Sequence, residues 1–147
     1  MELIETELNE KKDRLDDALS ATRAAIEEGI VPGGGMALVR ICASINLDDY
    51  KFVGDEKIGA EILLKACSQP FRTIIENAGL NPEVIINNLP EGFESGYDAR
   101  TNQYVNMIES GIIDPLKVTR CALDQSVSIS SLMLTTECIL SEQKPVE

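Results

Sequence analysis

The sequence contains no histidine and no tryptophan, and only 4% of its residues are aromatic. Without histidine there is no Ser–His–Asp triad and no histidine-containing zinc site, so acid–base chemistry would depend on carboxylates. The four cysteines, Cys42, Cys67, Cys121 and Cys138, lie far apart and form no CxxC pair. This spacing predicts reduced, mostly buried thiols in a reducing compartment and excludes the usual zinc-ligand patterns.

Long apolar runs are also missing. No stretch approaches the roughly 18 apolar residues of a membrane span. The first residues, "MELIETELNEKK", lack the basic and apolar regions of a secretion signal, although an organelle transit peptide could have been removed. The 147 residues, 44% of them hydrophobic, predict one soluble domain with a real core. With 25 acidic against 13 basic residues, the chain repels phosphate backbones, so nucleic acid and acidic membranes are not expected partners.

Most of the chain carries helical patterns. Apolar residues recur at seven- and four-residue steps from Thr6 to Glu28, which predicts an amphipathic arm helix that leaves a compact body. Gly29 and Pro32 end this helix. Four shorter helices are expected to follow, at residues 35–47, 55–68, 70–78 and 81–88. The first of the four is apolar on nearly all sides, which predicts a buried helix.

The second half opens with a different pattern. Residues 90–114 combine alternating side chains with glycines, which predicts a small β-hairpin. Asp114 before Pro115 predicts a capped helix that runs to about Leu134. The serines of this helix suggest close packing against neighbours: Ser126, Ser128, Ser130 and Ser131. The stretch "ECIL" near the end predicts a lone strand, which needs a sheet edge to pair with.

Three consecutive glycines, Gly33 to Gly35, precede the second helix. Glycines in a helix-forming region indicate that something approaches the bare backbone. Free amides at a helix N-terminus suit the phosphates of a nucleotide. The stretch lacks both the GxGxxG spacing and the lysine of a P-loop, so an ordinary turn is the alternative.

Carboxylates are the remaining candidates for chemistry. Asp16 and Asp17 are neighbours, but successive residues of a helix point about 100° apart, so only one of them can face a given site. Exposed acids on a solvated helix are the alternative reading of this pair. For Asp114 the alternative is helix capping, because an aspartate before a proline usually has that role.

Four stretches resemble the C-terminal part of group I chaperonins, the GroEL-like family: "KKDRLDDALSATRAAIEEGIVPGGGMALVR", "GYDARTNQY", "NMIESGIIDPLKVTRCAL" and "LMLTTEC". The likeness runs from about Glu5 to Leu140. It implies that residues 1–28 are the C-terminal segment of the intermediate domain. Residues 29–147 would be the C-terminal half of the equatorial domain, which binds ATP and forms rings. The implied fold is mainly α, with a small β-hairpin and a long N-terminal arm helix.

The resemblance also implies roles for single residues. Asp17 matches the aspartate that closes over the nucleotide and orients the attacking water. Gly34 matches the glycine that contacts the nucleotide, where a Cβ would push the ribose out. Asp114 matches the carboxylate at the ribose hydroxyls. The residues implied in nucleotide binding are Gly33, Gly34, Asp98, Ala99, Arg100, Ile112 and Asp114.

The chain departs from the family pattern in two places. Many bacterial members have "YNAAT" where this chain has "YDART", which puts side-chain contacts of Asp98 and Arg100 with adenine in doubt. The acid that makes the ring-to-ring contact in the family is replaced by Asn81. The "DGTTT"-type phosphate and magnesium loop, the segment that binds unfolded protein and the Gly-Met tail are missing, so the chain is expected to be a fragment.

Two functions follow. The first is half of the ATP site of a chaperonin, with Mg²⁺ held by residues outside this chain. Its partners would be other chaperonin subunits, a co-chaperonin and non-native polypeptides, in the bacterial cytoplasm or an organelle matrix. The alternative is a non-catalytic helical interaction or oligomerisation module. The chain alone is expected to hydrolyse no ATP and to self-associate through its arm helix or terminal strand.

Overall fold

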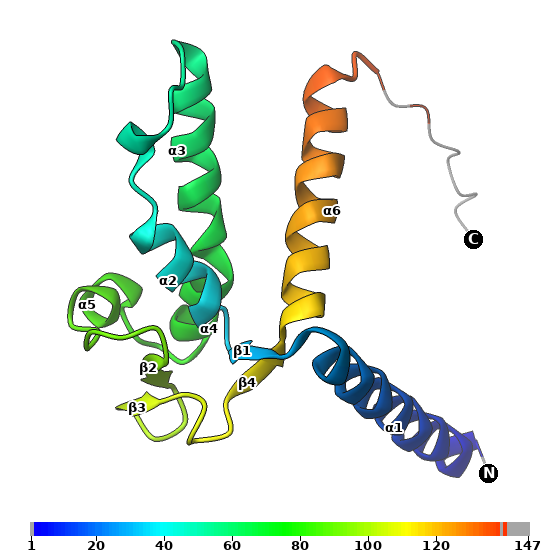
Figure 1. Cartoon of the computed structure of the whole chain (residues 1–147). Coiled ribbons are helices and arrows are strands. Elements are labelled where there is room, and N and C mark those ends of the chain that lie inside the picture. The colour runs from blue at the N-terminus through cyan, green and yellow to red at the C-terminus, as the bar shows by residue number, and fades with distance from the viewer. Residues whose placement is uncertain (1, 139, 141–147) are drawn as a thin grey trace.

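The computed structural model describes residues 2–138 and 140, with the backbone alone for residues 2–5. The fold is mainly α, as the sequence predicts, and Figure 1 shows its arrangement. The helices are α1 (Glu2–Glu28), α2 (Met36–Ser44), α3 (Asp55–Cys67), α4 (Gln69–Asn77), α5 (Pro82–Asn87) and α6 (Leu116–Thr135), with a 3-10 turn η1 (Leu47–Asp49). The strands are β1 (Ile30–Pro32), β2 (Ser95–Asp98), β3 (Gln103–Asn106) and β4 (Ile113–Pro115).

The core lies where α2, α4 and α5 meet the segment after β3. Met36, Ile75 and Met107 are almost completely buried, and Phe71 lies one helical turn before Ile75 on the same face of α4. This spacing of apolar residues is typical of a helix that packs one face against a core. The helices α2, α4 and α5 therefore pack around a core that they and Met107 supply.

Two antiparallel strand pairs connect the helices. β2 and β3 form the predicted hairpin, in which Tyr97 lies opposite Tyr104 and the two rings pack edge to face at 5.2 Å. Gly96 allows Met107 to pack against the hairpin, because a Cβ at this position would lie 2.6 Å from the Met107 side chain. β1 pairs with β4, which joins residues 30–32 to residues 113–115.

Helix α1 is the predicted arm. Figure 1 shows it leaving the body at the β1–β4 pair and extending away from the other helices. Its apolar stripe is exposed: Leu8 64%, Leu15 66%, Leu19 56% and Ile26 80%. Its last turns pack against α6, where Arg23, Ala24 and Glu27 lie beside Lys117 and Cys121. Within the described part of the chain, no helix combines the length and the apolar character needed to cross a membrane.

Two helix predictions need correction. The second helix ends at Ser44, because Asn46 caps the 3-10 turn instead, and its side chain accepts a hydrogen bond from the Asp48 amide at 3.2 Å. This helix is also buried on one side only, since Ile41 is 42% exposed. Asp114 caps no helix: it lies in β4, and α6 begins after Pro115 without a side-chain cap.

The C-terminal predictions also differ from the structure. The four serines of α6 are exposed, including Ser126 and Ser130, which line an open cavity between α6 and α3. Glu137, Cys138 and Leu140 lie in no strand, and residue 139 of the "ECIL" stretch lies outside the described residues. An edge strand requires a paired sheet, and the nearest described segment, α6, is helical.

Candidate functional site

The pairing of β1 with β4 builds a corner from two distant parts of the sequence. Val31 lies opposite Asp114, and Pro32 lies opposite Ile113. The pairing continues past the strands, where the Gly33 amide donates a hydrogen bond to the Ile112 carbonyl at 2.9 Å. The structure therefore brings together four of the predicted site residues: Gly33, Gly34, Ile112 and Asp114.

The three glycines of this corner differ in what an added Cβ atom would meet. A Cβ on Gly33 would lie 3.1 Å from the Ile112 carbonyl group, so Gly33 allows the two chain segments to approach. A Cβ on Gly35, at φ 77°, would lie 2.8 Å from the Phe71 amide, so Gly35 allows α2 to pack against α4. Gly34 has φ 62°, and a Cβ there would meet nothing within 4 Å. Of the three, Gly34 is thus the one with open space beside it, where a ligand can approach the backbone.

The start of α2 supplies a favourable field for an anion. Gly35 precedes the helix, and no side chain caps it. The first turn of α2 carries no acidic residue. The partial positive charge of the helix N-terminus is therefore not compensated locally, which favours a negatively charged group beside the glycines.

Asp114 is a half-buried carboxylate at the edge of a cavity of about 690 Å³. The cavity lies between α3 and α6 and is lined by Gly35, Thr119 and apolar side chains such as Ile62 and Val118. Among the hydrogen bonds and ion pairs of residues 2–138, none involves the Asp114 carboxylate. Its oxygens are therefore available to accept hydrogen bonds from a ligand.

The turn of the β2–β3 hairpin carries three further candidates. The Asp98 carboxylate accepts hydrogen bonds from the Thr101 hydroxyl and the Arg100 amide, both at 2.8 Å. These bonds, the one from Thr101 first, lower the pKa of Asp98. Ala99 packs against the core, and Arg100 is exposed. The Asp98 carboxylate thus stabilises the turn, and both of its oxygens already accept hydrogen bonds from within the turn.

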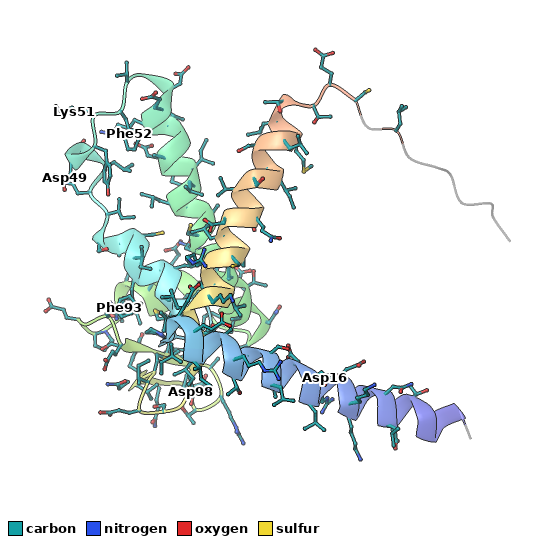
Figure 2. All side chains as sticks on the ribbon, turned by 45° about the vertical axis from the view of Figure 1, so that its right-hand side comes forward. Asp16, Asp49, Lys51, Phe52, Phe93 and Asp98 are labelled. Carbon is teal, nitrogen blue, oxygen red and sulfur yellow. The ribbon has the colours of Figure 1, made fainter. Side chains whose placement is uncertain are left out.

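Asp17 lies apart from the corner. It is exposed on α1, and it precedes Gly29 by 12 residues of chain, which corresponds to roughly 18 Å along a helix axis. Figure 2 shows its neighbour Asp16 on the arm, well separated from Asp98 in the body. The structure therefore does not bring Asp17 together with Gly34 and Asp114.

Sequence reasoning missed the ion pairs that hold the arm to α6. Glu28 accepts two hydrogen bonds from Arg120, at 2.7 and 3.1 Å, and Glu27 pairs with Lys117. The hydrogen bond and charge of Arg120 lower the pKa of Glu28. No local pattern could have indicated these pairs, because their members are about ninety residues apart in the sequence.

Arg40 was missed as well. Its guanidinium donates hydrogen bonds to the Ser95 carbonyl at 3.1 and 2.9 Å, and to the Pro90 carbonyl. Partial burial lowers the pKa of Arg40. The single cation in the apolar "GGMALVRICASINL" stretch was the available signal. Through these hydrogen bonds, Arg40 connects α2 to the loop that precedes β2.

Comparison with known proteins identifies a family, related sequences and related structures. Residues 4–144 match the model of the TCP-1/cpn60 chaperonin family. The chain is 50% identical over 143 residues to Chaperonin GroEL 3 of Acaryochloris marina (strain MBIC 11017), across 95% of this chain and 26% of that protein. It also resembles the crystal structure of a group III chaperonin in the open state, with a TM-score of 0.69 and 26% identity over 80% of this chain and 25% of that one. The chain spans about a quarter of the length of these relatives.

Proposed function

This chain belongs to the TCP-1/cpn60 chaperonin family, and we propose that it supplies half of the ATP site of a chaperonin that assists the folding of non-native polypeptides. The observation that carries the proposal is the corner between β1 and β4. There, Gly34 leaves open space beside the backbone, and the Asp114 carboxylate offers unused acceptors. Such a corner suits the ribose of a nucleotide, because a carboxylate can accept hydrogen bonds from both hydroxyls of a diol.

Each residue of the corner has a proposed task. Gly34 lets the nucleotide approach the backbone, and Gly33 keeps Ile112 close enough to pack against the base. Asp114 holds the ribose hydroxyls. The uncapped start of α2 favours the negative charge of the phosphates. Ala99 and the backbone of the turn next to Asp98 and Arg100 flank the adenine.

Asp17 needs a movement of the arm before it can act. Residues 1–28 are proposed to be a segment of the intermediate domain and residues 29–147 half of the equatorial domain. Gly29, at φ 87° and with nothing within 4 Å of an added Cβ, lies between them. If the arm turns there over the site, Asp17 orients the water that attacks the γ-phosphate supplied by ATP.

The remaining parts of the site are proposed to lie outside this chain. The Mg²⁺ ion and the phosphates need further ligands, which a separate phosphate loop would supply. Other chaperonin subunits, a co-chaperonin and non-native polypeptides are the proposed partners, in a bacterial cytoplasm or an organelle matrix. At Asn81, where the family has a ring-contact acid, the amide oxygen caps α5 by accepting a hydrogen bond from Glu83 at 3.0 Å.

Substitution of Asp114 in the full-length protein tests the proposed site. Asp114→Ala should weaken nucleotide binding about tenfold or more, because hydrogen bonds to a charged acceptor contribute roughly 1.5–3 kcal/mol. Asp124→Ala on the following helix, α6, removes the same charge from an exposed position and serves as the matched control. Binding of a fluorescent ATP analogue and thermal melting would be measured together. Equal affinity of the two variants would place the nucleotide elsewhere.

A second candidate function, a helical oligomerisation module, is favoured for the chain by itself. Its accessible surface is 11600 Å², whereas a compact protein of 16.1 kDa exposes about 7,400 Å². Apolar side chains of α1 and α6 contribute to this excess, since Ile26 is 80% and Leu134 is 88% exposed. We expect no ATP turnover by the isolated chain and concentration-dependent self-association. Sedimentation across a broad concentration range would measure the latter, and a strict monomer would argue against the module.

A further inference from the structure

Two of the four cysteines come from different helices and meet. Cys67 is the last residue of α3 and is 7% exposed, and α3 packs against α2. Leu38 of α2 lines the same cavity as Cys67, and Cys42 follows Leu38 by one helical turn on the same face. The Cys67 thiol is close enough to Cys42 to raise its pKa through charge and hydrogen bonding. The fold therefore places Cys42 and Cys67 side by side, although 24 residues separate them in the sequence.

The surroundings of Cys42 favour its thiol form. Burial, and then the neighbouring Cys67 thiol, raise the pKa of Cys42 to about 11. Cys42 is nevertheless half-exposed, so a small molecule can reach it. The other cysteines have different surroundings: Cys121 lies beside the arm at the base of α6, and Cys138 is exposed.

We propose that Cys42 and Cys67 form a thiol–disulfide site, which a small-molecule disulfide such as oxidised glutathione converts into an intramolecular bond. The thiolate of one cysteine attacks a sulfur of the reagent, and one glutathione thiol leaves. The second thiolate then attacks the protein sulfur of this mixed disulfide and releases the second glutathione. Two electrons pass from the protein dithiol to the reagent, and the two thiol protons end on the two released glutathione molecules.

The bond would join the last turn of α3 to α2. It would close a loop that contains residues 43–66, and a closed loop of this length restricts the unfolded chain strongly. It would also restrain α2, the helix that begins directly after the three glycines. The proposal rests on the packing of α3 against α2, which brings Cys67 to the face of α2 that carries Leu38 and Cys42, and it is independent of the nucleotide site.

The experiment uses the 147-residue chain with Cys121→Ser and Cys138→Ser, so that only the pair remains. After equilibration with oxidised and reduced glutathione, free thiols are alkylated and the chain is cut with trypsin. Peptide 41–51 should be found joined to peptide 66–72 in a product two hydrogens lighter than their sum. The ratio of oxidised to reduced pair should be at least tenfold higher in the native chain than in concentrated urea, because the fold brings the thiols together.

Two further measurements keep the test decisive. The oxidised variant should melt roughly 6–12 °C above its reduced form. The matched Cys42→Ser variant, checked for folding by circular dichroism, should gain glutathione at most once and show no such rise. A native ratio equal to or below the ratio in urea would overturn the proposal. So would a product in which both cysteines carry glutathione instead of being joined to each other.

Discussion

The α2–α5 body and the two long helices differ in where their apolar residues find partners. In the body, Met36 and Ile75 are completely buried against each other's helices and the hairpin. On α1 and α6 no described residue is buried, and side chains such as Ile26 and Leu134 are 80% and 88% exposed. Both regions have amphipathic helices. An amphipathic pattern thus indicates that a helix has a partner, but not that the partner lies in the same chain.

The largest effect on stability is expected inside the body. Ile75→Ala should lower the free energy of unfolding by about 2–5 kcal/mol, because it leaves a cavity in a fully packed core. Ile129→Ala on α6 removes the same atoms from a residue that is 59% exposed, and it should change the value by less than about 0.5 kcal/mol. Urea titration of this chain measures both. If both variants lost similar free energy of unfolding, the two regions would not differ in how well their apolar residues are packed.

The arm should matter for turnover and not for folding. In the full-length protein, Asp17→Asn is expected to lower ATP turnover about 100-fold or more, because the carboxylate acts on the attacking water in the transition state. Nucleotide affinity and melting temperature should stay nearly unchanged, since Asp17 is exposed in this structure. Asp16→Asn is the matched control. If binding falls as much as turnover, Asp17 has a structural role.

The three glycines lie between the two regions, and substitutions of Gly34 and Gly35 should differ in their cost to stability. Gly35→Ala should cost about 2 kcal/mol or more, because the new Cβ meets the Phe71 amide at 2.8 Å in a left-handed conformation. Gly34→Ala should lower the free energy of unfolding by only about 1–2 kcal/mol, the cost of placing alanine in a left-handed conformation, because its Cβ meets no neighbour within 4 Å.

In the full-length protein, Gly34→Val should reduce nucleotide affinity more than stability. Melting curves and binding of an ATP analogue separate the two quantities. A collapse of the melting temperature at unchanged affinity per folded molecule would make Gly34 an ordinary turn residue.

The smallest effect is expected at the joint between the arm and α6. Arg120 lowers the pKa of Glu28, so this ion pair contributes stability above the ordinary glutamate pKa and loses it as the pH falls through the lowered value. An NMR titration of the Glu28 carboxyl should show the lowered pKa, and Arg120→Ala should raise it towards the ordinary range. An unchanged pKa in the variant would assign the shift to another cause.

Local patterns predicted the elements of the fold well. The arm helix, the hairpin and the cap at Asn81 depend on residues close in sequence, so their signals are complete within a short window. The resemblance to chaperonins, which rests on long motifs, is confirmed by the family match over residues 4–144. Asp114 is not the helix cap that was predicted, and the serines of α6, expected to pack closely against neighbours, are exposed. Both outcomes depend on what lies across from each residue.

The candidate site shows the same division. The sequence alone indicated that the glycines leave the backbone bare, since this follows from the missing Cβ atoms. It could not show that Gly34 is the one of the three consecutive glycines with open space beside it, that Asp114 lies opposite Val31, or that Cys42 lies near Cys67. The roles of Asp17, Gly34 and Asp114 in nucleotide chemistry stay predictions.

Residue type and spacing by themselves determined the mainly helical fold, the acidic surface and the family of this protein. These properties follow from short-range sterics, helical periodicity and charge count. The tertiary structure alone decided which face of each helix is covered, which glycine is open and which distant residues meet. Those outcomes depend on contacts between segments far apart in the sequence, and a contact of that kind leaves no pattern in either segment by itself.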